Sequence, residues 1–264
     1  MNSDVNIVYE CKDFVVAEKP HDMPTAPLLE TETETALNAV LELFPEGRNV
    51  CGKKSIEHGL VHRLDTATHG LFLVALNQAS FDSLWAQQQN GDFLKGYTAY
   101  CTKQLNDDFP PCSYKLQKRL KIESYFRYFG LKNSEVRPVA LDGTSGKAAT
   151  RKTQNKIYTT FIDDFCEFSG FCSGGFSKLG SIYKISCTLK SGFKHQVRAH
   201  LSWLGFPIIG DMLYCPTAKK QPDNNIFDYN LELHATSLSF FNPVTSERCL
   251  FSIDDTATFC KNKN

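Results

Sequence analysis

The chain has 264 residues, 42% of them hydrophobic, so it is long enough to bury a substantial core in one domain. Lys plus Arg and Asp plus Glu number 29 each, which excludes a strong overall field toward an acidic partner and leaves nucleic-acid binding to a local basic surface. Ten cysteines without a Cys-x-x-Cys pair, behind an N-terminus that lacks the apolar segment of a signal peptide, indicate a reduced, cytoplasmic protein without a structural zinc site.

The first predicted elements are two strands, a helix and a buried strand. Residues 5–10 and 14–18 have strand character around a short polar turn and predict a hairpin. Between residues 37 and 44, apolar side chains recur at i, i+3, i+4 and i+7, which predicts an amphipathic helix. The continuous apolar run at 71–76 predicts a strand buried on both faces, and it is far too short to span a membrane.

The middle of the chain alternates one helix with strands. Residues 78–89 are predicted to form a helix, and residues 96–101, 156–161 and 182–189 are predicted to form strands. Residues 165–180 are rich in Gly, Ser and Phe and show neither helical nor strand periodicity. We therefore expect an irregular insertion or a long hairpin tip over this segment.

The last third predicts one more helix and two strands. Apolar side chains recur at helical spacing at Val197, Leu201 and Leu204. This pattern places His195 and Arg198 together on the opposite, polar side of the helix. Residues 235–241 and 248–253 have strand character on either side of a turn. Without a repeat or a linker, the chain is expected to form one α+β domain over residues 1–264, with a mainly antiparallel mixed sheet flanked by helices.

Positive charge is concentrated between residues 113 and 160, where eleven Lys or Arg stand against three acids. Residues 1–50 show the reverse, with ten acids and three bases. One interpretation is a pair of solvated faces of opposite sign. The other is a strip that follows a phosphate backbone, since aromatic residues are interleaved with the bases. The side chains considered for RNA contact in this stretch are Lys115, Lys118, Arg119, Lys121, Arg151 and Lys152.

A carboxylate stands in a loop just before the apolar run, in the sequence His62-Arg63-Leu64-Asp65. The buried strand that follows would hold this loop rigidly, and a basic neighbour would keep the carboxylate ionised by lowering its pKa. By itself, however, an Asp in a turn is more often a cap for the local backbone than a catalytic group.

Four ordered motifs together resemble the RluA-type pseudouridine synthases. They are Gly59-Leu-Val-His-Arg-Leu-Asp65, Lys95-Gly-Tyr-Thr-Ala99, Ser191-Gly-Phe-Lys-His-Gln-Val-Arg-Ala-His-Leu201, and Leu204-Gly-Phe-Pro-Ile-Ile-Gly-Asp211 with Tyr214. Weaker similarity extends to residues 14–20 and to the Leu-His-Ala and Asn-Pro sequences at 233–243. The resemblance implies the pseudouridine synthase fold, the isomerisation of uridine to pseudouridine in RNA, and a compact family member without an N-terminal S4-like domain.

Two positions depart from the family's motifs. His69 stands where the family has Ser, and Phe193 stands where it has Arg, although Lys194 follows directly. Because Arg198 is retained, we expect catalysis to survive, while the contacts of the missing arginine are put in doubt.

The resemblance assigns roles to three side chains. Asp65 would be the catalytic carboxylate, Arg198 would pair with it, and Tyr97 would lie over the uracil with its hydroxyl placed to take the C5 proton. Three apolar side chains would wall the pocket or merely pack in the core: Leu71, Ile208 and Ile209. Since the reaction removes no electrons and adds no group, neither a cofactor nor a metal is expected.

The expected partner is a structured RNA, a stem-loop of ribosomal or transfer RNA, from which the target nucleotide would be flipped out. Arg63 would contact a neighbouring phosphate or fill the vacated space, and His62 would do the same or pack within its loop. Lys194 and His195 join the candidate RNA contacts. We expect a monomer that does not associate with membranes.

Two other functions are compatible with parts of the sequence. A catalytically inactive RNA-binding protein of the same fold would have no need for Asp65, Tyr97 and Arg198 together. A metal-dependent hydrolase would use Asp65, His195 and His200, but two histidines five positions apart on a helix do not both face one ion.

Overall fold

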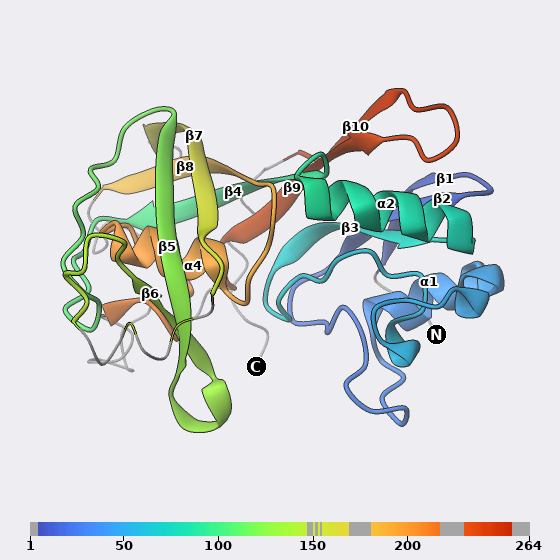
Figure 1. Ribbon diagram of the computed structural model, residues 1–264, viewed down its shortest axis with the longest axis horizontal. Helices are drawn as coiled ribbons and strands as arrows, with labels where there is room; N and C mark the ends of the chain where they lie inside the picture. Colours follow the sequence, from blue (N-terminus) through green and yellow to red (C-terminus); the bar gives the residue numbers. More distant parts are fainter. Residues whose placement is uncertain are drawn as a thin grey trace, which may run out of the picture. The chain divides into compact units, whose positions relative to one another are not determined.

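The structure is a computed structural model that describes residues 5–146, 150, 153, 155–168, 181–216 and 230–254 (Figure 1). The chain forms two compact units, the first within Met1–Tyr97 and His234–Asp255, the second within Thr98–Leu233 and Thr256–Asn264. Compact units of this kind can belong to one folding domain, so the single catalytic domain expected over residues 1–264 stays a prediction.

The first unit is built on a mixed sheet. Its strands run in the order β1-β2-β3-β9, and β10 pairs with β9. All these pairs are antiparallel except β3 with β9, which is parallel and places His69 opposite His234. The strands are β1 (Asn6–Glu10), β2 (Phe14–Lys19), β3 (His69–Ala75), β9 (Leu233–Phe241) and β10 (Arg248–Ser252). The predicted N-terminal hairpin and both tail strands are therefore confirmed.

Both faces of β2 and β3 are buried, because successive side chains of a strand point to opposite sides of the sheet. On one face, Val15, Ala17, Phe72 and Val74 share a core cluster with Leu37, Val40 and Leu41 of helix α1 (Ala36–Leu43). On the other, Phe14, Val16, Leu71 and Leu73 share a cluster with Phe81 and Leu84 of α2 (Gln78–Asn90). The apolar run at 71–76 is thus buried on both faces, as predicted.

Each of these two helices begins at a capping side chain. Thr35 accepts a hydrogen bond from the backbone N–H of Asn38 at 3.2 Å, and Asn77 accepts one from Ser80 at 2.9 Å. Such caps satisfy N–H groups that the helix itself leaves without a partner. Gly91 ends α2 with a φ of +81°, a left-handed conformation that glycine adopts without strain.

The second unit is built on a sheet with the order β4-β8-β7-β5-β6, in which the pairs β8–β7, β7–β5 and β5–β6 are antiparallel. Strand β4 (Leu94–Thr102) begins in the first unit and continues into the second. The other strands are β5 (Leu120–Phe129), β6 (Glu135–Val139), β7 (Tyr158–Phe168) and β8 (Ile182–Leu189). Short 3-10 turns lie at Pro45–Asn49, Ser55–Glu57 and Leu131–Asn133. This is the predicted α+β class, with a mainly antiparallel mixed sheet and few helices.

The prediction of an irregular segment over 165–180 is wrong for its first four residues. They continue β7, where Phe165 pairs with Ile185 and Phe168 with Ile182 of β8. Pairing with a well-formed neighbouring strand outweighs a local composition that favours neither helix nor strand. Residues 169–180 lie outside the described residues, and residues 156–157, also predicted as strand, precede β7.

The predicted polar side of the last helix is wrong as well. All eight residues of α4 (Gln196–Trp203) are buried, and His195 precedes the helix in a left-handed conformation with a φ of +53°. Polar side chains tolerate this burial because they have partners. His200, for example, is hydrogen-bonded to Ser124 and Thr160, each at 2.8 Å, and burial lowers its pKa to about 3.

Candidate active site

The loop that carries Asp65 is held by side chains of an earlier segment. Thr25 donates to the carbonyl of Leu64 at 2.8 Å and accepts from its N–H at 3.1 Å. Lys19 donates to the carbonyl of Thr66 at 2.8 Å, and within the loop the N–H of Thr68 donates to the carbonyl of Asp65 at 3.0 Å. These bonds fix the backbone on both sides of the half-buried Asp65 carboxylate, as the sequence predicted for a rigid loop.

Lys19 provides a positive group close to Asp65 within the first unit. Its side chain is fully buried, and its ammonium also donates to the carbonyl of Pro20 at 2.8 Å. Burial lowers the pKa of Lys19 to about 7, against the opposing effect of the carboxylates of Asp22 and Asp65. Sequence reasoning missed this residue, although it lies in the Val-Val-x-x-Lys-Pro segment at 15–20.

Tyr97 lies on β4 and is 9% exposed. Burial, and secondarily the negative charge of Asp65, raises the pKa of its phenol well above the ordinary value. The first unit therefore brings together two of the three predicted catalytic side chains, close enough for one charge to act on the other.

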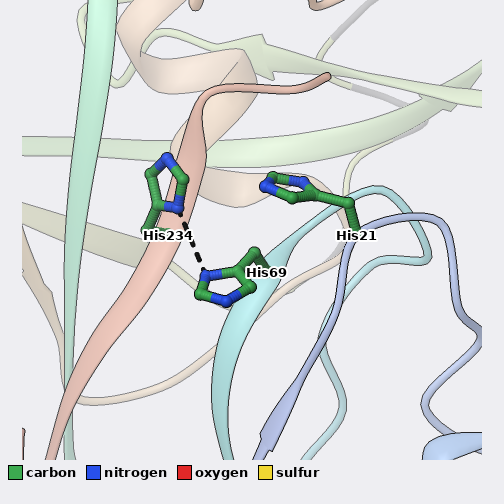
Figure 2. A group of neighbouring side chains, drawn as sticks. All are labelled: His21, His69 and His234. Atoms are coloured by element: carbon green, nitrogen blue, oxygen red, sulfur yellow. Dashed lines mark hydrogen bonds between the residues drawn. The ribbon is translucent and has the colours of Figure 1, made fainter. Parts of the chain in front are cut away.

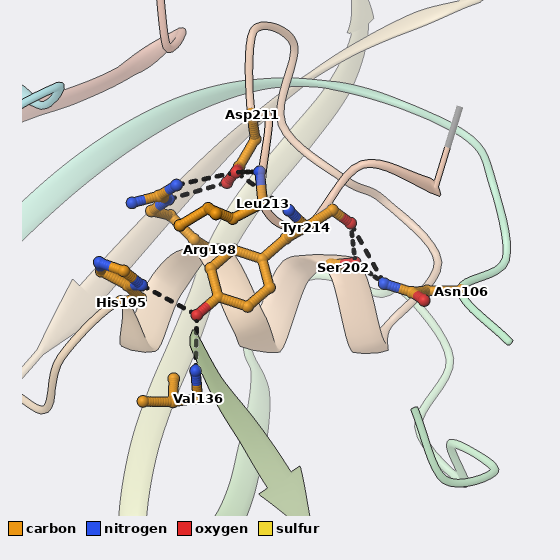
Figure 3. A network of polar contacts seen from close by, with 8 residues as sticks. All are labelled: Asn106, Val136, His195, Arg198, Ser202, Asp211, Leu213 and Tyr214. Carbon is orange, nitrogen blue, oxygen red and sulfur yellow. Dashed lines mark hydrogen bonds and ion pairs between the residues drawn. The ribbon is translucent and has the colours of Figure 1, made fainter. Parts of the chain in front are cut away.

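Arg198, the third predicted catalytic residue, has a partner that the sequence analysis did not identify. Its Nε and Nη2 atoms donate to the two carboxylate oxygens of Asp211, each at 2.8 Å, and both side chains are buried (Figure 3). One Asp211 oxygen also accepts from the N–H groups of Leu213 and Tyr214. The Gly-Asp at the end of the fourth motif was the available signal. Arg198 and Asp65 belong to different units, so their pairing stays a prediction.

His195 and Arg198 do converge, but on Tyr214 and not through a shared helix face (Figure 3). The Tyr214 hydroxyl accepts from the N–H of Val136 at 2.9 Å and lies 2.9 Å from His195 Nδ1. The Arg198 guanidinium carbon lies 5.2 Å from the centre of the Tyr214 ring. Because both ring nitrogens of His200 are engaged by hydroxyl groups, a hydrolase site using His195 and His200 has no support.

The candidate RNA contacts of the first unit differ in exposure. The Arg63 side chain is 39% exposed and forms an ion pair of 3.0 Å with Glu57. His62 is buried against Phe93, and burial holds its pKa well below the ordinary value. This favours the alternative in which His62 packs within its loop.

Several candidate RNA contacts of the second unit have protein partners. Lys118 pairs with Asp164 at 2.7 Å, and Lys121 pairs with Glu123 at 2.8 Å. Glu123 is one of the three acids already counted between residues 113 and 160, and Asp164 lies beyond that stretch and offsets one further positive charge. Lys194 donates to the carbonyl of residue 133 at 2.8 Å, and Arg119 adopts a left-handed conformation with a φ of +57°. Arg151 and Lys152 lie outside the described residues.

The three apolar side chains predicted to wall a pocket are all buried. Leu71 is part of the core cluster between the sheet and α2, so core packing accounts for it. Ile208 bridges to Cys101 of β4, and Ile209 donates its N–H to the carbonyl of Tyr100. A role for these residues in a pocket stays a prediction.

Phe193 and His69, the two departures from the family's motifs, have different surroundings. Phe193 packs among aromatic rings, with centres 4.8 Å from Tyr158 and 5.2 Å from Phe126. His69 Nε2 donates a hydrogen bond to the Glu18 carboxylate at 3.0 Å, and this bond is the main cause that lowers the pKa of the Glu18 carboxyl.

Comparison with known proteins finds matches along most of the chain. The profile of the family described as RNA pseudouridylate synthase matches residues 13–203. A Bacillus subtilis protein named Uncharacterized RNA pseudouridine synthase YlyB is 26% identical over 245 residues, which cover 92% of this chain and 67% of that protein. The Ribosomal large subunit pseudouridine synthase D of Blochmanniella floridana is 24% identical over 253 residues, with the same two coverages.

Solved structures show the same fold. The human protein named RNA Pseudouridylate Synthase Domain Containing 1 superposes with a TM-score of 0.61 at 19% identity, covering 96% of this chain and 84% of that protein. Human RNA Pseudouridylate Synthase Domain Containing 4 gives a TM-score of 0.58 at 20% identity. At this identity the likeness establishes the fold alone.

The fold and the family match define an RNA-modifying isomerase. Because the family profile spans well over half of the sequence, the chain belongs to the RNA pseudouridylate synthase family. It is an RNA pseudouridine synthase, which confirms the predicted family, reaction class and RNA substrate and sets aside the inactive RNA-binding alternative. In the described part of the chain, no helix is long and apolar enough to cross a membrane.

Proposed function

We propose that Asp65 is the catalytic carboxylate of this enzyme and acts on a uridine flipped out of a structured RNA. The observation that supports this most is the state of its loop, whose backbone is fixed at Leu64 and Thr66 by side chains of another segment. A carboxylate on such a loop is held in one orientation before the substrate arrives, which is what catalysis by a single acid requires.

The reaction needs Asp65 to be ionised. Breaking the N1–C1′ bond and joining C5 to C1′ requires a carboxylate that attacks C1′, adds to C6 of the uracil, or removes a sugar proton, and each of these routes starts from the anion. Lys19 lies close enough for the Asp65 carboxylate to raise the pKa of its buried amino group, so the two charges attract each other whenever both are present.

We assign the removal of the C5 proton to Tyr97. Because its raised pKa keeps the phenol protonated near neutral pH, its oxygen can take the C5 proton only while it passes its own proton on. The negative charge of Asp65 contributes to the raised pKa of Tyr97, so the two groups are close. We therefore propose Asp65 as the acceptor of the phenol proton.

Arg198 is proposed to orient Asp65, and Asp211 would hold the guanidinium for that task. Two parallel N–H bonds to Asp211 fix the plane of the guanidinium group, which a single contact would leave to rotate. In this role Arg198 would bind two carboxylates, that of Asp211 in its own unit and that of Asp65.

The finer identity of the substrate is also a proposal. RNA of the large ribosomal subunit is the first candidate, because the relatives in Blochmanniella floridana and Vibrio parahaemolyticus are named for that subunit, and transfer RNA is the second. We propose that the enzyme acts as a monomer in the cytoplasm, with Arg63 and the exposed lysines contacting phosphates.

The proposal is tested with ribosomal and transfer RNA transcripts and a chelator in the reaction. Pseudouridine is mapped after incubation with the wild type, with Asp65→Asn, and with Asp82→Asn as a matched control, since Asp82 is an exposed helix residue. The wild type and the control should modify the same uridine, and Asp65→Asn should modify none while giving an unchanged circular dichroism spectrum. Modification of that uridine by Asp65→Asn would refute the assignment.

A further inference from the structure

Three histidines from separate parts of the first unit converge beside the Asp65 loop (Figure 2). His21 follows β2, His69 begins β3, and His234 lies on β9. Each can place one ring nitrogen within 4.8 Å of the others. The parallel pairing of β3 with β9 sets two of them opposite each other, and neither the proposed chemistry nor the core packing uses the three rings together.

The hydrogen bonds of the cluster show which nitrogens carry lone pairs. A carbonyl can only accept, so His21 Nδ1 carries the proton that it shares with the carbonyl of Ala67 at 3.0 Å. In the neutral ring, His21 Nε2 is then an acceptor, and it is buried without a hydrogen-bond partner among the described residues. In the same way, His69 Nε2 donates to the Glu18 carboxylate at 3.0 Å, which leaves the lone pair of the neutral ring on Nδ1.

The distance between two of the rings matches a metal site. His69 Nδ1 accepts a hydrogen bond from His234 Nδ1 at 3.3 Å (Figure 2), so an ion bound between the two nitrogens would take the place of this shared proton. Two nitrogens bound tetrahedrally at roughly 2.0–2.1 Å from one Zn²⁺ ion would be about 3.3–3.4 Å apart. The His21 ring is stacked on the His69 ring, with 5.2 Å between their centres. The three ligand nitrogens lie within 4.8 Å of one another, so the His21 ring has to turn and bring its nitrogen at most about 1.5 Å closer to the other two to bind the same ion.

The outer contacts are also those of a metal site. A histidine that binds a metal usually donates its other N–H to a carboxylate or a backbone carbonyl, which fixes the orientation of the ring. His69 does so to Glu18, and His21 does so to Ala67. His69 is one of the two positions that depart from the motifs this sequence resembles, so the third imidazole is not part of that resemblance.

We propose that His21, His69 and His234 bind one divalent transition-metal ion of the zinc or cobalt type, with Glu18 orienting His69. The ion takes no part in the isomerisation. It ties β2, β3 and β9 together and, through the bond from His21 to Ala67, fixes the loop two residues beyond Asp65. This inference does not rest on the proposed function, since binding is measurable with the metal alone.

The test is a titration of chelator-treated protein with Co²⁺, whose visible absorption reports tetrahedral coordination. The wild type should bind one ion with the spectrum of nitrogen and oxygen ligands. His69→Ser restores the family residue, and His21→Phe keeps a ring without a nitrogen, so both should fold and both should weaken binding at least about tenfold. His58→Asn is the matched control, because His58 lies in the same unit outside the cluster and bonds instead to the carbonyl of Arg48.

A second measurement separates loss of binding from loss of fold. Zn²⁺ should raise the thermal midpoint of the wild type and of His58→Asn by mass action, and at the same Zn²⁺ concentration it should raise those of His69→Ser and His21→Phe by less. Three results would overturn the proposal. They are a wild type that binds no ion, variants of His21 and His69 that bind as tightly as the wild type, and a sulfur-to-cobalt absorption band showing that cysteines hold the ion.

Discussion

Asp211 offers the clearest test of how the second unit positions Arg198. Replacing Asp211 by Asn keeps an oxygen that can accept from Leu213 and Tyr214, but it sets an NH₂ group against the guanidinium. The side chains of Arg198 and Asp211 are 7% and 0% exposed, so the guanidinium stays buried after it has lost the Asp211 carboxylate. Breaking a buried pair by removing one partner typically costs about 3–5 kcal/mol.

The expected loss of unfolding free energy for Asp211→Asn is therefore about 3–5 kcal/mol, measured by urea unfolding. Asp164→Asn is the matched control. It breaks an ion pair of 2.7 Å with Lys118 whose side chains are 64% and 59% exposed, so it should cost at most about 1 kcal/mol. The two distances are nearly equal, and the difference in outcome isolates the effect of burial.

A double-mutant cycle measures the interaction free energy between Arg198 and Asp211. Arg198→Met with Asp211→Asn removes both charges, so the double variant should be clearly more stable than the sum of the two single losses predicts. Additive losses, or a loss below about 1 kcal/mol for Asp211→Asn, would show that the pair does not hold the guanidinium and would refute its proposed role.

Two further perturbations follow from buried basic groups. Burial lowers the pKa of His200 from 6.5 to about 3, so between these pH values the unfolded chain binds more protons than the native protein. The free energy of unfolding therefore falls as the pH falls from 6.5 to 3, by up to about 1.4 kcal/mol per pH unit. His200→Gln should flatten this part of the curve of unfolding free energy against pH, and an unchanged slope would contradict the assignment. Lys19→Met removes the donor to the carbonyls of Pro20 and Thr66 and should cost about 1–3 kcal/mol for each carbonyl left without a partner. The Lys19→Met variant should also form less pseudouridine. If it were as stable in urea as the wild type, water would have replaced the ammonium as the donor to the two carbonyls.

The sequence predicted those elements whose signal is local. The helix at α1 and the buried strand at β3 follow from periodicity and from an apolar run, and both were found within two residues of the expected bounds. The end of β7 was missed because Phe165 and Phe168 are strand residues only through their partners on β8. The burial of α4 was missed for a related reason, since a polar side chain such as His200 can be buried once distant hydroxyls satisfy it.

In the candidate site, too, the residues within local motifs could be predicted and their distant partners could not. Asp65, Tyr97 and Arg198 could be named because each lies in a compact motif. The groups that position them could not, because Lys19 and Thr25 act across more than 30 residues of chain. The histidine cluster is the extreme case, since residues 21, 69 and 234 have no spacing that a search for local ligand pairs would detect.

The segment from Lys19 to Thr25 holds the loop around Asp65 in place. Its side chains bond the loop backbone at three successive points: Thr25 at Leu64, Lys19 at Thr66 and His21 at Ala67. The loop around Asp65 is thus fixed by side chains, and each of these bonds can be changed without unfolding a strand. An ion bound to His21 would strengthen its bond to Ala67, because a metal makes the remaining N–H a better donor. Metal loading should then stiffen the loop without supplying any chemistry, which distinguishes this site from a catalytic metal centre.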